Sequence, residues 1–406
     1  MGETQVSTNQ PTAPEWVANL QARLSPPRSP GLRSALTLTA AALLLLAAAN
    51  LAVAWYYSNV LYDLALEVRP DDVEYDVVAT VAGDGLVRLE DGPGDGQWRL
   101  PGRWGLVWDG GNGMMGDIVE DGATHVVRAF TLVDGNPPSA APAEVVSDIF
   151  PNDPFRAFGI EYTQVEYDAP LGAQDAWLFE GSLDTWAIFV HGHRGKRGDG
   201  LPALPTLHAL GIPALFITYR NDPGQPGDPS NIYQYGLTEW RDLHAAVQHV
   251  LSQPDVERVV LIGDSMGGGI VTKFLYESPL AASVAAVVLD SPVLDFNAPV
   301  DLGARQRNIP GFVTATVKWV ATQRFGVDWI AMDYLKDANR LDVPILLLHG
   351  TDDTRVPIET SDELAQLRPD IVQYSVYENT THGDAWNTNP NRYESELKAF
   401  LVEATR

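Results

Sequence analysis

The residue of this chain best placed to do chemistry is Ser265. An apolar run, Arg258 to Ile262, leads into the segment GDSMGG that contains this serine, and a helical pattern begins at Gly268. The segment fits G-x-S-x-G in a strand–turn–helix setting, where glycines permit a sharp turn that lifts the serine above the sheet. A helix N-terminus directly behind the hydroxyl favours negative charge there. The pattern predicts a nucleophilic serine; the alternative is a tight turn without chemistry.

A serine hydroxyl needs a base, and the base needs an orienting carboxylate. Downstream, the apolar run Pro344 to Leu348 leads into HGTDDTRVP, which contains Asp352 and Asp353. A further β-like run, Val372 to Tyr377, precedes ENTTHGD, and its His382 is the only histidine after Asp353. We therefore expect His382 to be the base.

These motifs resemble those of α/β-hydrolases. The pattern H-G-x-x-D-x-x-V-P is similar to the acid-bearing loop of that family, and aligning it places Asp353 in the acid role, with Asp352 as an alternative shifted by one residue. Similar hydrolases carry their base in a loop of the kind that contains His382. The resemblance implies a triad of Ser265, Asp353 and His382, an acyl-enzyme on the serine, and no metal or organic cofactor.

The oxyanion that forms on attack requires two backbone N–H donors, one from the residue after the nucleophile and one from the first strand–helix loop. Met266 is the expected first donor. The run Trp186 to Val190 ends in HGHRG, which resembles the H-G-x loop of the family, so His193 is the expected second donor through its main chain. Its imidazole either contacts substrate or faces solvent. A zinc site on His191 and His193 is the metal alternative, although no third ligand is evident.

Two further features accompany these motifs. Arg220 follows the run Ala214 to Tyr219, and its guanidinium either binds a substrate carboxylate or, more simply, braces its own loop. Residues 295–340 lie between two strands, where related hydrolases carry a lid. We expect a lid insertion there, without assigning roles to its residues.

Strands and helices must position these residues. From about residue 157, apolar strands alternate with amphipathic helices, as in a mostly parallel sheet covered on both faces. The expected strands are Trp186 to Val190, Ala214 to Tyr219, Arg258 to Ile262, Ala285 to Leu289, Pro344 to His349 and Val372 to Tyr377. The expected helices are Leu237 to Leu251, Gly268 to Glu277, Glu359 to Leu367 and Asn391 to Glu403. The resemblance implies that residues 157–406 form an α/β-hydrolase domain with a mostly parallel, eight-stranded sheet.

A small β-rich module and a linker are expected over residues 58–156. Short runs of β-like composition alternate there with Gly and Asp turns, as in an antiparallel sheet. The runs are Tyr75 to Val81, Leu86 to Leu89, Trp104 to Trp108 and His125 to Leu132. The segment Asn136 to Pro142 contains three prolines and is the expected linker.

The uncharged stretch at residues 34–57 is long enough to cross a bilayer, which takes about 20 apolar residues. Arginines dominate before it and carboxylates after it, so the positive-inside rule predicts a single-pass protein of the cell membrane with its N-terminus in the cytoplasm. Residues 1–33, rich in Pro, Ser, Thr and Gln, indicate a disordered cytoplasmic tail. A signal peptide cleaved near Ala54 is the alternative.

Composition excludes several classes of function. The 406 residues include no cysteine, which rules out thiolate catalysis, disulfides and cysteine-ligated metals. The net charge is −26, and the chain has no basic stripe that would bind nucleic acid. The expected partners are a small-molecule or peptide acyl substrate and, through residues 34–57, the lipid bilayer.

Together these features predict a serine hydrolase that cleaves an ester, thioester or amide bond. An acyltransferase would use the same residues, with an alcohol or amine as the second nucleophile. A catalytically inactive surface binding protein with the hydrolase fold is the remaining alternative, and it predicts no reaction with serine-directed probes.

Overall fold

The structure is a computed structural model that describes residues 30–70, 75–91, 97–150 and 152–405. It consists of two compact units, one ending at Tyr57 and the other beginning at Ser58. Of the tail expected over residues 1–33, residues 1–29 lie outside the described part of the chain. Residues 30–33 belong to a helix rather than to a tail.

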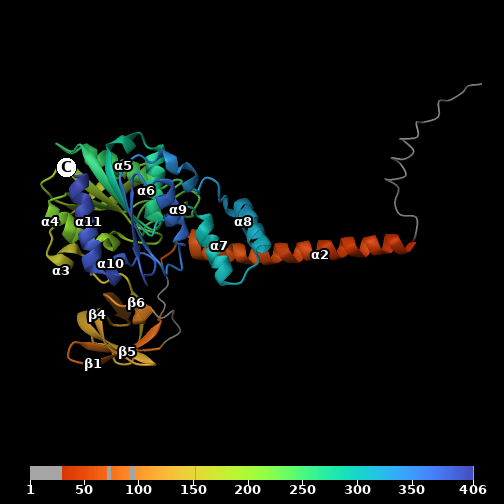
Figure 1. Cartoon of the computed structure of the whole chain (residues 1–406), viewed down its shortest axis with the longest axis horizontal. Helices are drawn as coiled ribbons and strands as arrows, with labels where there is room; N and C mark the ends of the chain where they lie inside the picture. The colour runs from red at the N-terminus through yellow and green to blue at the C-terminus, as the bar shows by residue number, and fades with distance from the viewer. Residues whose placement is uncertain (1–29, 71–74, 92–96, 151, 406) are drawn as a thin grey trace, which may run out of the picture. The chain divides into compact units, whose positions relative to one another are not determined.

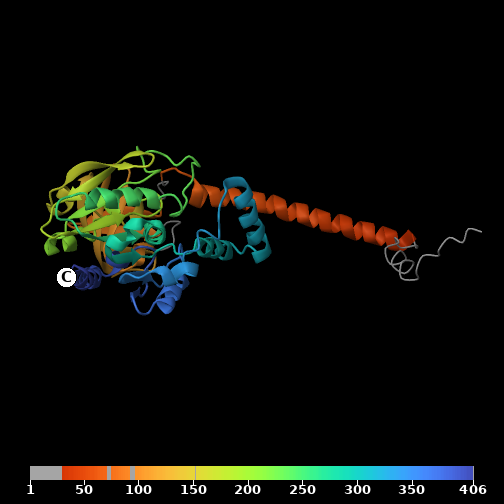
Figure 2. The same ribbon diagram turned by 90° about the horizontal axis from the view of Figure 1, so that it is seen from above.

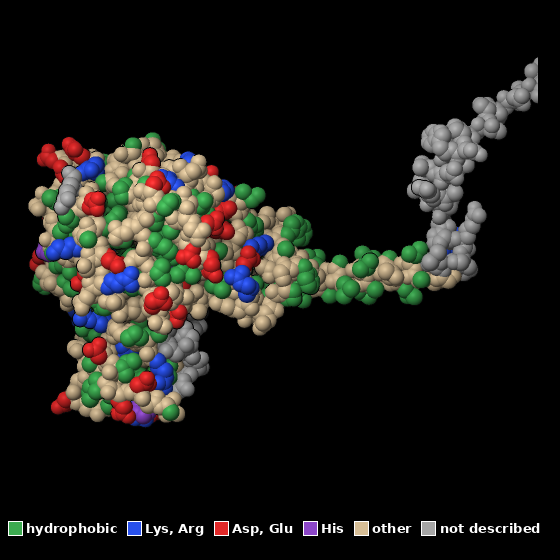
Figure 3. Space-filling model, in the orientation of Figure 1, with side chains coloured by type: hydrophobic (Ala, Val, Ile, Leu, Met, Phe, Trp, Pro, Cys, Tyr) green, Lys and Arg blue, Asp and Glu red, His purple; other side chains and the backbone are tan. Residues whose placement is uncertain are grey.

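The apolar stretch forms one long helix, α2 (Pro30–Leu61), which both views in Figures 1 and 2 show as continuous. It is long and apolar enough to cross a membrane. Its leucines between Leu36 and Leu51 are exposed, with Leu38 at 71% and Leu45 at 72%, and hydrophobic side chains follow the helix in Figure 3. Exposing a leucine to water costs roughly 2 kcal/mol, so these side chains favour an apolar environment. A π-helical turn, η1 (Tyr62–Leu66), follows α2.

The β-rich module is a closed barrel with the strand order β1-β2-β5-β4-β3-β6, and every neighbouring pair is antiparallel. Its strands are β1 (Val77–Gly83), β2 (Leu86–Asp91), β3 (Trp104–Trp108), β4 (Gly111–Asp121), β5 (His125–Gly135) and β6 (Ala141–Val146). Inward side chains such as Leu89, Trp104 and Leu106 form a core of the barrel's own. The buried guanidinium of Arg128 donates to main-chain oxygens of Trp98, Leu100, Gly102 and Gly116, which satisfies its N–H groups.

The linker expected at Asn136 to Pro142 was wrong in its last two residues. Only residues 136–140 form a loop, and β6 starts at Ala141 and closes the barrel by pairing with both β1 and β3. Pro142 is tolerated because it pairs with β1 only and lies beyond the residues of β6 that pair with β3. The long strand β4 was missed, because its glycines hide the alternating pattern.

The hydrolase domain is built on an eight-stranded, mostly parallel sheet with the order β14-β13-β12-β11-β9-β10-β8-β7, which confirms the expected fold class. The strands are β7 (Thr163–Ala169), β8 (Gly172–Phe179), β9 (Thr185–Val190), β10 (Ala214–Ile217), β11 (Arg258–Asp264), β12 (Val284–Asp290), β13 (Ile345–Gly350) and β14 (Val372–Tyr377). Strand β8 runs antiparallel to both of its neighbours, β7 and β10.

Helices cover both faces of this sheet (Figure 1). They are α3 (Pro154–Phe158), α4 (Leu204–Leu210), α5 (Trp240–Leu251), α6 (Met266–Glu277), α7 (Asn297–Gln306), α8 (Gly311–Phe325), α9 (Glu359–Leu367), α10 (Ala385–Thr388) and α11 (Pro390–Ala404). Along β11, Leu261 faces the core shared with α5, α6 and α9, whereas Val260 and Ile262 face the core shared with α4 and α11. Burial on both faces explains why the central strands are continuously apolar.

Candidate active site

Ser265 lies on a strained turn between strand β11 and helix α6. Its backbone has φ 51° and ψ −115°, a conformation that is costly for any residue with a Cβ. Hydrogen bonds hold it there, because Ser265 N–H donates to Asp290 O (2.9 Å) and Ser265 O accepts from Val293 N–H (2.9 Å). Gly267 lets the helix approach β9, since a Cβ on it would overlap the main-chain oxygen of Val190.

Three side chains predicted from separate motifs meet at the carboxyl edge of the sheet. His382, in the loop after β14, has its Nε2 2.8 Å from Ser265 Oγ. Its Nδ1 lies 2.7 Å from Oδ2 of Asp353, which follows β13. Because the carboxylate can only accept, Nδ1 carries the proton and Nε2 is free to accept from the serine hydroxyl.

The Asp353 carboxylate is saturated with donors. Main-chain N–H groups of Arg355 and Val356 each donate to Oδ1 at 2.8 Å, and His349 Nε2 lies 3.1 Å from Oδ2. Burial alone would raise the pKa of this carboxyl, but His382 and hydrogen bonds from His349 and His382 hold the pKa well below its usual range. Asp352, the alternative acid, is exposed and accepts from Thr351 Oγ1 (2.9 Å) instead of contacting His382.

The loop after β9 lies directly against Ser265. A Cβ on Gly192 would come within 2.9 Å of the Ser265 Cβ, so only glycine allows this approach. The next residue is His193, and Met266 is the first residue of α6. Within the described part of the chain, the main-chain N–H groups of His193 and Met266 donate to no acceptor, which leaves both available to an oxyanion.

The two histidines of this loop have different surroundings. His191 is buried, lies 2.8 Å from Asp222 Oδ2 through its Nε2, and stacks on Tyr219 with ring centroids 4.3 Å apart. The His193 ring packs edge-on against Tyr233 (4.6 Å) and parallel to Tyr235 (5.9 Å). Burial lowers the pKa of His193 to about 3, so the ring is neutral. Among the described residues no group of three or more His, Asp or Glu side chains could hold a metal ion.

Arg220 braces its loop. Its Nε and Nη2 donate to both carboxylate oxygens of Asp242 (2.7 and 2.9 Å), and its Nη1 donates to Asp228 (3.0 Å). All three side chains are buried. The guanidinium is therefore fully engaged by the protein, and the simpler of the two expected roles is the one that the structure shows.

A cavity of about 530 Å³ opens beside Ser265 and His382. Its lining includes six acids that the sequence analysis did not single out: Glu144, Asp148, Asp199, Asp264, Asp290 and Asp384. Burial raises the pKa of Asp199 to about 6 and that of Asp290 to about 7, and it raises the pKa of Asp264 and Asp384 as well. The only available signal was position in the sequence, because Asp264 adjoins Ser265 and Asp384 follows His382 by two residues.

The barrel module and its linker complete the walls of this cavity. Residues 144–150 line it. Ser147 Oγ donates to Asp384, and Asn387 Nδ2 donates to the main-chain oxygens of Ser147 (2.7 Å) and Arg103 (2.9 Å). Sequence reasoning could not have found these contacts, because they join segments more than 200 residues apart.

The region in which a lid was expected, residues 295–340, contains α7, α8 and a short 3₁₀ segment, η5 (Leu335–Arg340). One contact links it to the acid-bearing loop, since Gln306 Nε2 donates to Thr354 O (2.9 Å). Thr354 also lines the cavity. A lid at this place remains a prediction.

Comparisons with known proteins agree with this architecture. Residues 229–406 match the family model described as the prolyl oligopeptidase family, and residues 77–146, the barrel, match a domain of unknown function, DUF8805. The Pyrococcus furiosus esterase Pf2001 superposes with a TM-score of 0.52 at 22% identity, over 64% of this chain and 96% of that one.

Curated relatives are distant. The uncharacterized protein Rv2307c of Mycobacterium tuberculosis is 25% identical, over 66% of this chain and 85% of its own. Lysophosphatidylserine lipase ABHD12 of Danio rerio is 24% identical, over 48% of this chain and 51% of its own. The match to that lipase thus spans about half of each protein.

The sheet, the turn that carries Ser265 and these likenesses define a hydrolase fold. The chain belongs to the α/β-hydrolase superfamily, here combined with an N-terminal apolar helix and a closed β-barrel module.

Proposed function

We propose that this protein is a serine hydrolase that cleaves an ester, thioester or amide bond through an acyl-enzyme on Ser265. One observation carries the proposal: an unbroken hydrogen-bonded line runs from Ser265 Oγ through His382 to Asp353, with distances of 2.8 and 2.7 Å. The serine at its end adjoins a cavity large enough for a small acyl substrate.

The geometry supports a two-step reaction. His382 Nε2 takes the proton of Ser265 Oγ while the oxygen attacks the acyl carbon, and the main-chain N–H groups of His193 and Met266 donate hydrogen bonds to the oxyanion that forms. The tetrahedral intermediate collapses as His382 protonates the leaving group, which departs and leaves an ester on Ser265. Water, deprotonated by His382, then attacks that ester; the bond to Ser265 Oγ breaks, the acyl group leaves as the carboxylic acid, and His382 returns the proton to the serine oxygen. Asp353 stabilises the imidazolium that forms in each step.

We further propose that α2 anchors the enzyme in the cell membrane by a single span, with the N-terminus in the cytoplasm and the hydrolase domain outside. The support is the exposed apolar surface of α2 and the bias of arginines before it and carboxylates after it. An anchored enzyme has ready access to lipid esters. The relative named as a lysophosphatidylserine lipase supports testing esters of this kind alongside nitrophenyl esters.

The test is labelling with a fluorophosphonate probe, which reacts with an activated serine. The full chain in detergent micelles should gain one probe per molecule by intact mass, and Ser265→Ala should gain none. Equal labelling of both proteins would refute Ser265 as the nucleophile. A folded but unlabelled wild type would instead support the inactive binding protein.

Transfer to a second nucleophile is the remaining alternative. It is separated from hydrolysis by adding glycerol or an amine to the ester assay. A new acyl product formed faster than the free acid would establish an acyltransferase.

A further inference from the structure

The residues that follow the apolar stretch of α2 are built into the hydrolase domain. This connecting segment, residues 58–69, buries Leu66 completely. Leu66 O accepts from Tyr233 N–H (2.9 Å), and the next residue, Glu67, forms an antiparallel bridge with Ile232. The Tyr62 ring packs against Phe325 of α8 with centroids 4.9 Å apart. The connecting segment is therefore a folded element of the domain rather than a free tether.

The connecting segment also reaches the loop that follows β9. Arg194 Nη2 donates to the main-chain oxygens of Asp63 (2.8 Å) and Glu67 (3.3 Å). Arg194 directly follows His193, and its φ of 55° lies in the left-handed region that a residue with a Cβ rarely adopts. Such a conformation persists only where its surroundings hold it, and here the two carbonyls of the connecting segment are among the groups that do so.

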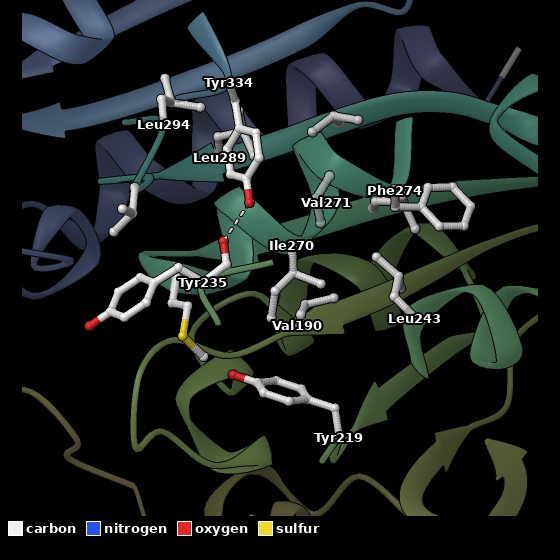
Figure 4. Close-up of a cluster of buried hydrophobic side chains, with 14 of the residues drawn as sticks. Val190, Tyr219, Tyr235, Leu243, Ile270, Val271, Phe274, Leu289, Leu294 and Tyr334 are labelled. Carbon is white, nitrogen blue, oxygen red and sulfur yellow. Dashed lines mark hydrogen bonds between the residues drawn. The ribbon is translucent and has the colours of Figure 1, made fainter. Parts of the chain in front are cut away.

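The same segment supports the two tyrosines that enclose His193. Tyr235 Oη donates to Ala65 O (2.9 Å), while Tyr235 O accepts from Tyr334 Oη (2.8 Å), the bond drawn in Figure 4. Tyr233 is held through its N–H by Leu66. The His193 ring packs against both tyrosine rings. His193 is thus tied to the connecting segment through its own side chain and through the residue after it.

We propose that the connecting segment positions the second oxyanion donor, the main-chain N–H of His193, and that Arg194 is the positioning residue that links them. This inference rests on the proposed hydrolysis at Ser265. A donor must lie within about 3 Å of the developing oxyanion, and misplacement by about 1 Å costs up to a hundredfold in rate. Attachment of the domain to its apolar helix is then part of the active-site architecture.

The experiment compares ester hydrolysis by the full chain in detergent micelles. Arg194→Ala should lower kcat roughly tenfold to a hundredfold with KM within about twofold, because the donor acts on the transition state. A trifluoromethyl ketone, which forms a tetrahedral adduct, should bind more weakly by a similar factor. Arg194→Lys should recover part of kcat, since its ammonium can donate to one of the two carbonyls.

Arg368→Ala is the matched control. Arg368 also donates to a main-chain oxygen, that of Ala338 (3.1 Å), and it does not line the cavity. Its kcat and KM should equal those of the wild type. Tyr235→Phe provides a second test that does not depend on the folding of Arg194→Ala. It removes only the bond to Ala65 O and should also lower kcat without raising KM.

The outcomes separate this inference from the proposed function. If the wild type labels with fluorophosphonate but both Arg194→Ala and Tyr235→Phe keep the kcat of the wild type, the positioning role is overturned and the proposed hydrolysis is not. A rise in KM at constant kcat in both variants would also overturn it, because it would indicate loss of substrate binding. An unlabelled wild type would overturn the proposed function, and the inference with it.

Discussion

At the scale of single residues, Asp353 has the most demanding environment. Its carboxylate accepts from two main-chain N–H groups and from His382, while His349 Nε2, which also lies 3.1 Å from Val356 O, is 3.1 Å from Oδ2. An amide at this position can present only one acceptor oxygen. If that oxygen keeps the main-chain bonds, the NH₂ group faces His382 Nδ1 and forces the proton onto Nε2, where it blocks acceptance from Ser265.

Asp353→Asn should therefore keep its fold and lose activity. We expect kcat to fall by roughly 10³- to 10⁴-fold, the usual cost of the wrong histidine tautomer in a triad. Steady-state hydrolysis of a nitrophenyl ester measures the loss, and circular dichroism checks the fold. Asp352→Asn is the matched control, because Asp352 is exposed and its carboxylate accepts from the adjacent Thr351 instead of contacting His382. Loss of activity in the control but not in Asp353→Asn would transfer the acid role to Asp352.

Residues inside short motifs could be placed from the sequence, because the motif itself sets their spacing from a strand end. Ser265, Asp353 and His382 belong to this kind, and the structure brings them together. The position of Asp290 in the site could not be predicted. It is an isolated aspartate at a strand end, and the sequence does not show that strand β11 pairs with β12 so that Asp264 lies beside it. The support of His193 by the connecting segment was hidden for the same reason.

At the scale of elements, the turn between β11 and α6 depends on close packing. A Cβ on Gly267 would overlap Val190 O and come within 2.7 Å of His191 O, and both of these are main-chain atoms that cannot rotate away. Gly267→Ala should destabilise the domain by roughly 3 kcal/mol, the upper end for overpacked sites. Chemical denaturation followed by circular dichroism measures the change.

Gly311→Ala is the control for this substitution. Gly311 is the first residue of α8, and a Cβ there would meet no atom within 4 Å. Alanine is the better helix former, so this variant should be as stable as the wild type or slightly more so. Equal stability of Gly267→Ala and the wild type would show that β9 and α6 can separate without cost.

The elements that could be predicted are those whose buried residues recur at a regular spacing along the chain. The central strands β9 to β13 are buried on both faces and are apolar along most of their length, and α9 matched its expected bounds. Strands β7 and β8 were missed because they lie at one edge of the sheet, where polar residues such as Glu166 and Asp175 alternate with buried ones. Turn glycines likewise concealed β4.

At the scale of the whole molecule, the excess of acids extends into the interior. The chain has a net charge of −26, and six acidic residues, among them Asp264 and Asp290, line the cavity beside Ser265. Asp264 and Asp290 are neighbours across β11 and β12; burial raises the pKa of both, and repulsion by Asp290 raises the pKa of Asp264 further. Ionising such groups inside the fold costs free energy that ionising them in the unfolded chain does not.

Stability should therefore fall as the pH rises toward neutrality. Burial raises the pKa of Asp290 to about 7, against about 3.9 for an aspartate in an unfolded chain. Between these values the folded state binds more protons than the unfolded state. The stabilising contribution is thus complete below pH of about 4 and is lost as the pH passes through about 7. Because an asparagine side chain does not ionise, the Asp290→Asn variant does not lose this contribution to stability.

The melting temperature of Asp290→Asn, measured in the full chain, should match that of the wild type near pH 4 and exceed it by several degrees at pH 8. The underlying difference is of the order of 1–3 kcal/mol, below the full value of the shift because the Asp290 side chain is partly exposed and solvent screens its charge. The comparison requires only thermal scans at four or five pH values. A difference that stays constant from pH 4 to pH 8 would mean that Asp290 titrates alike in the folded and unfolded chains, and that its carboxylate is well solvated in the cavity.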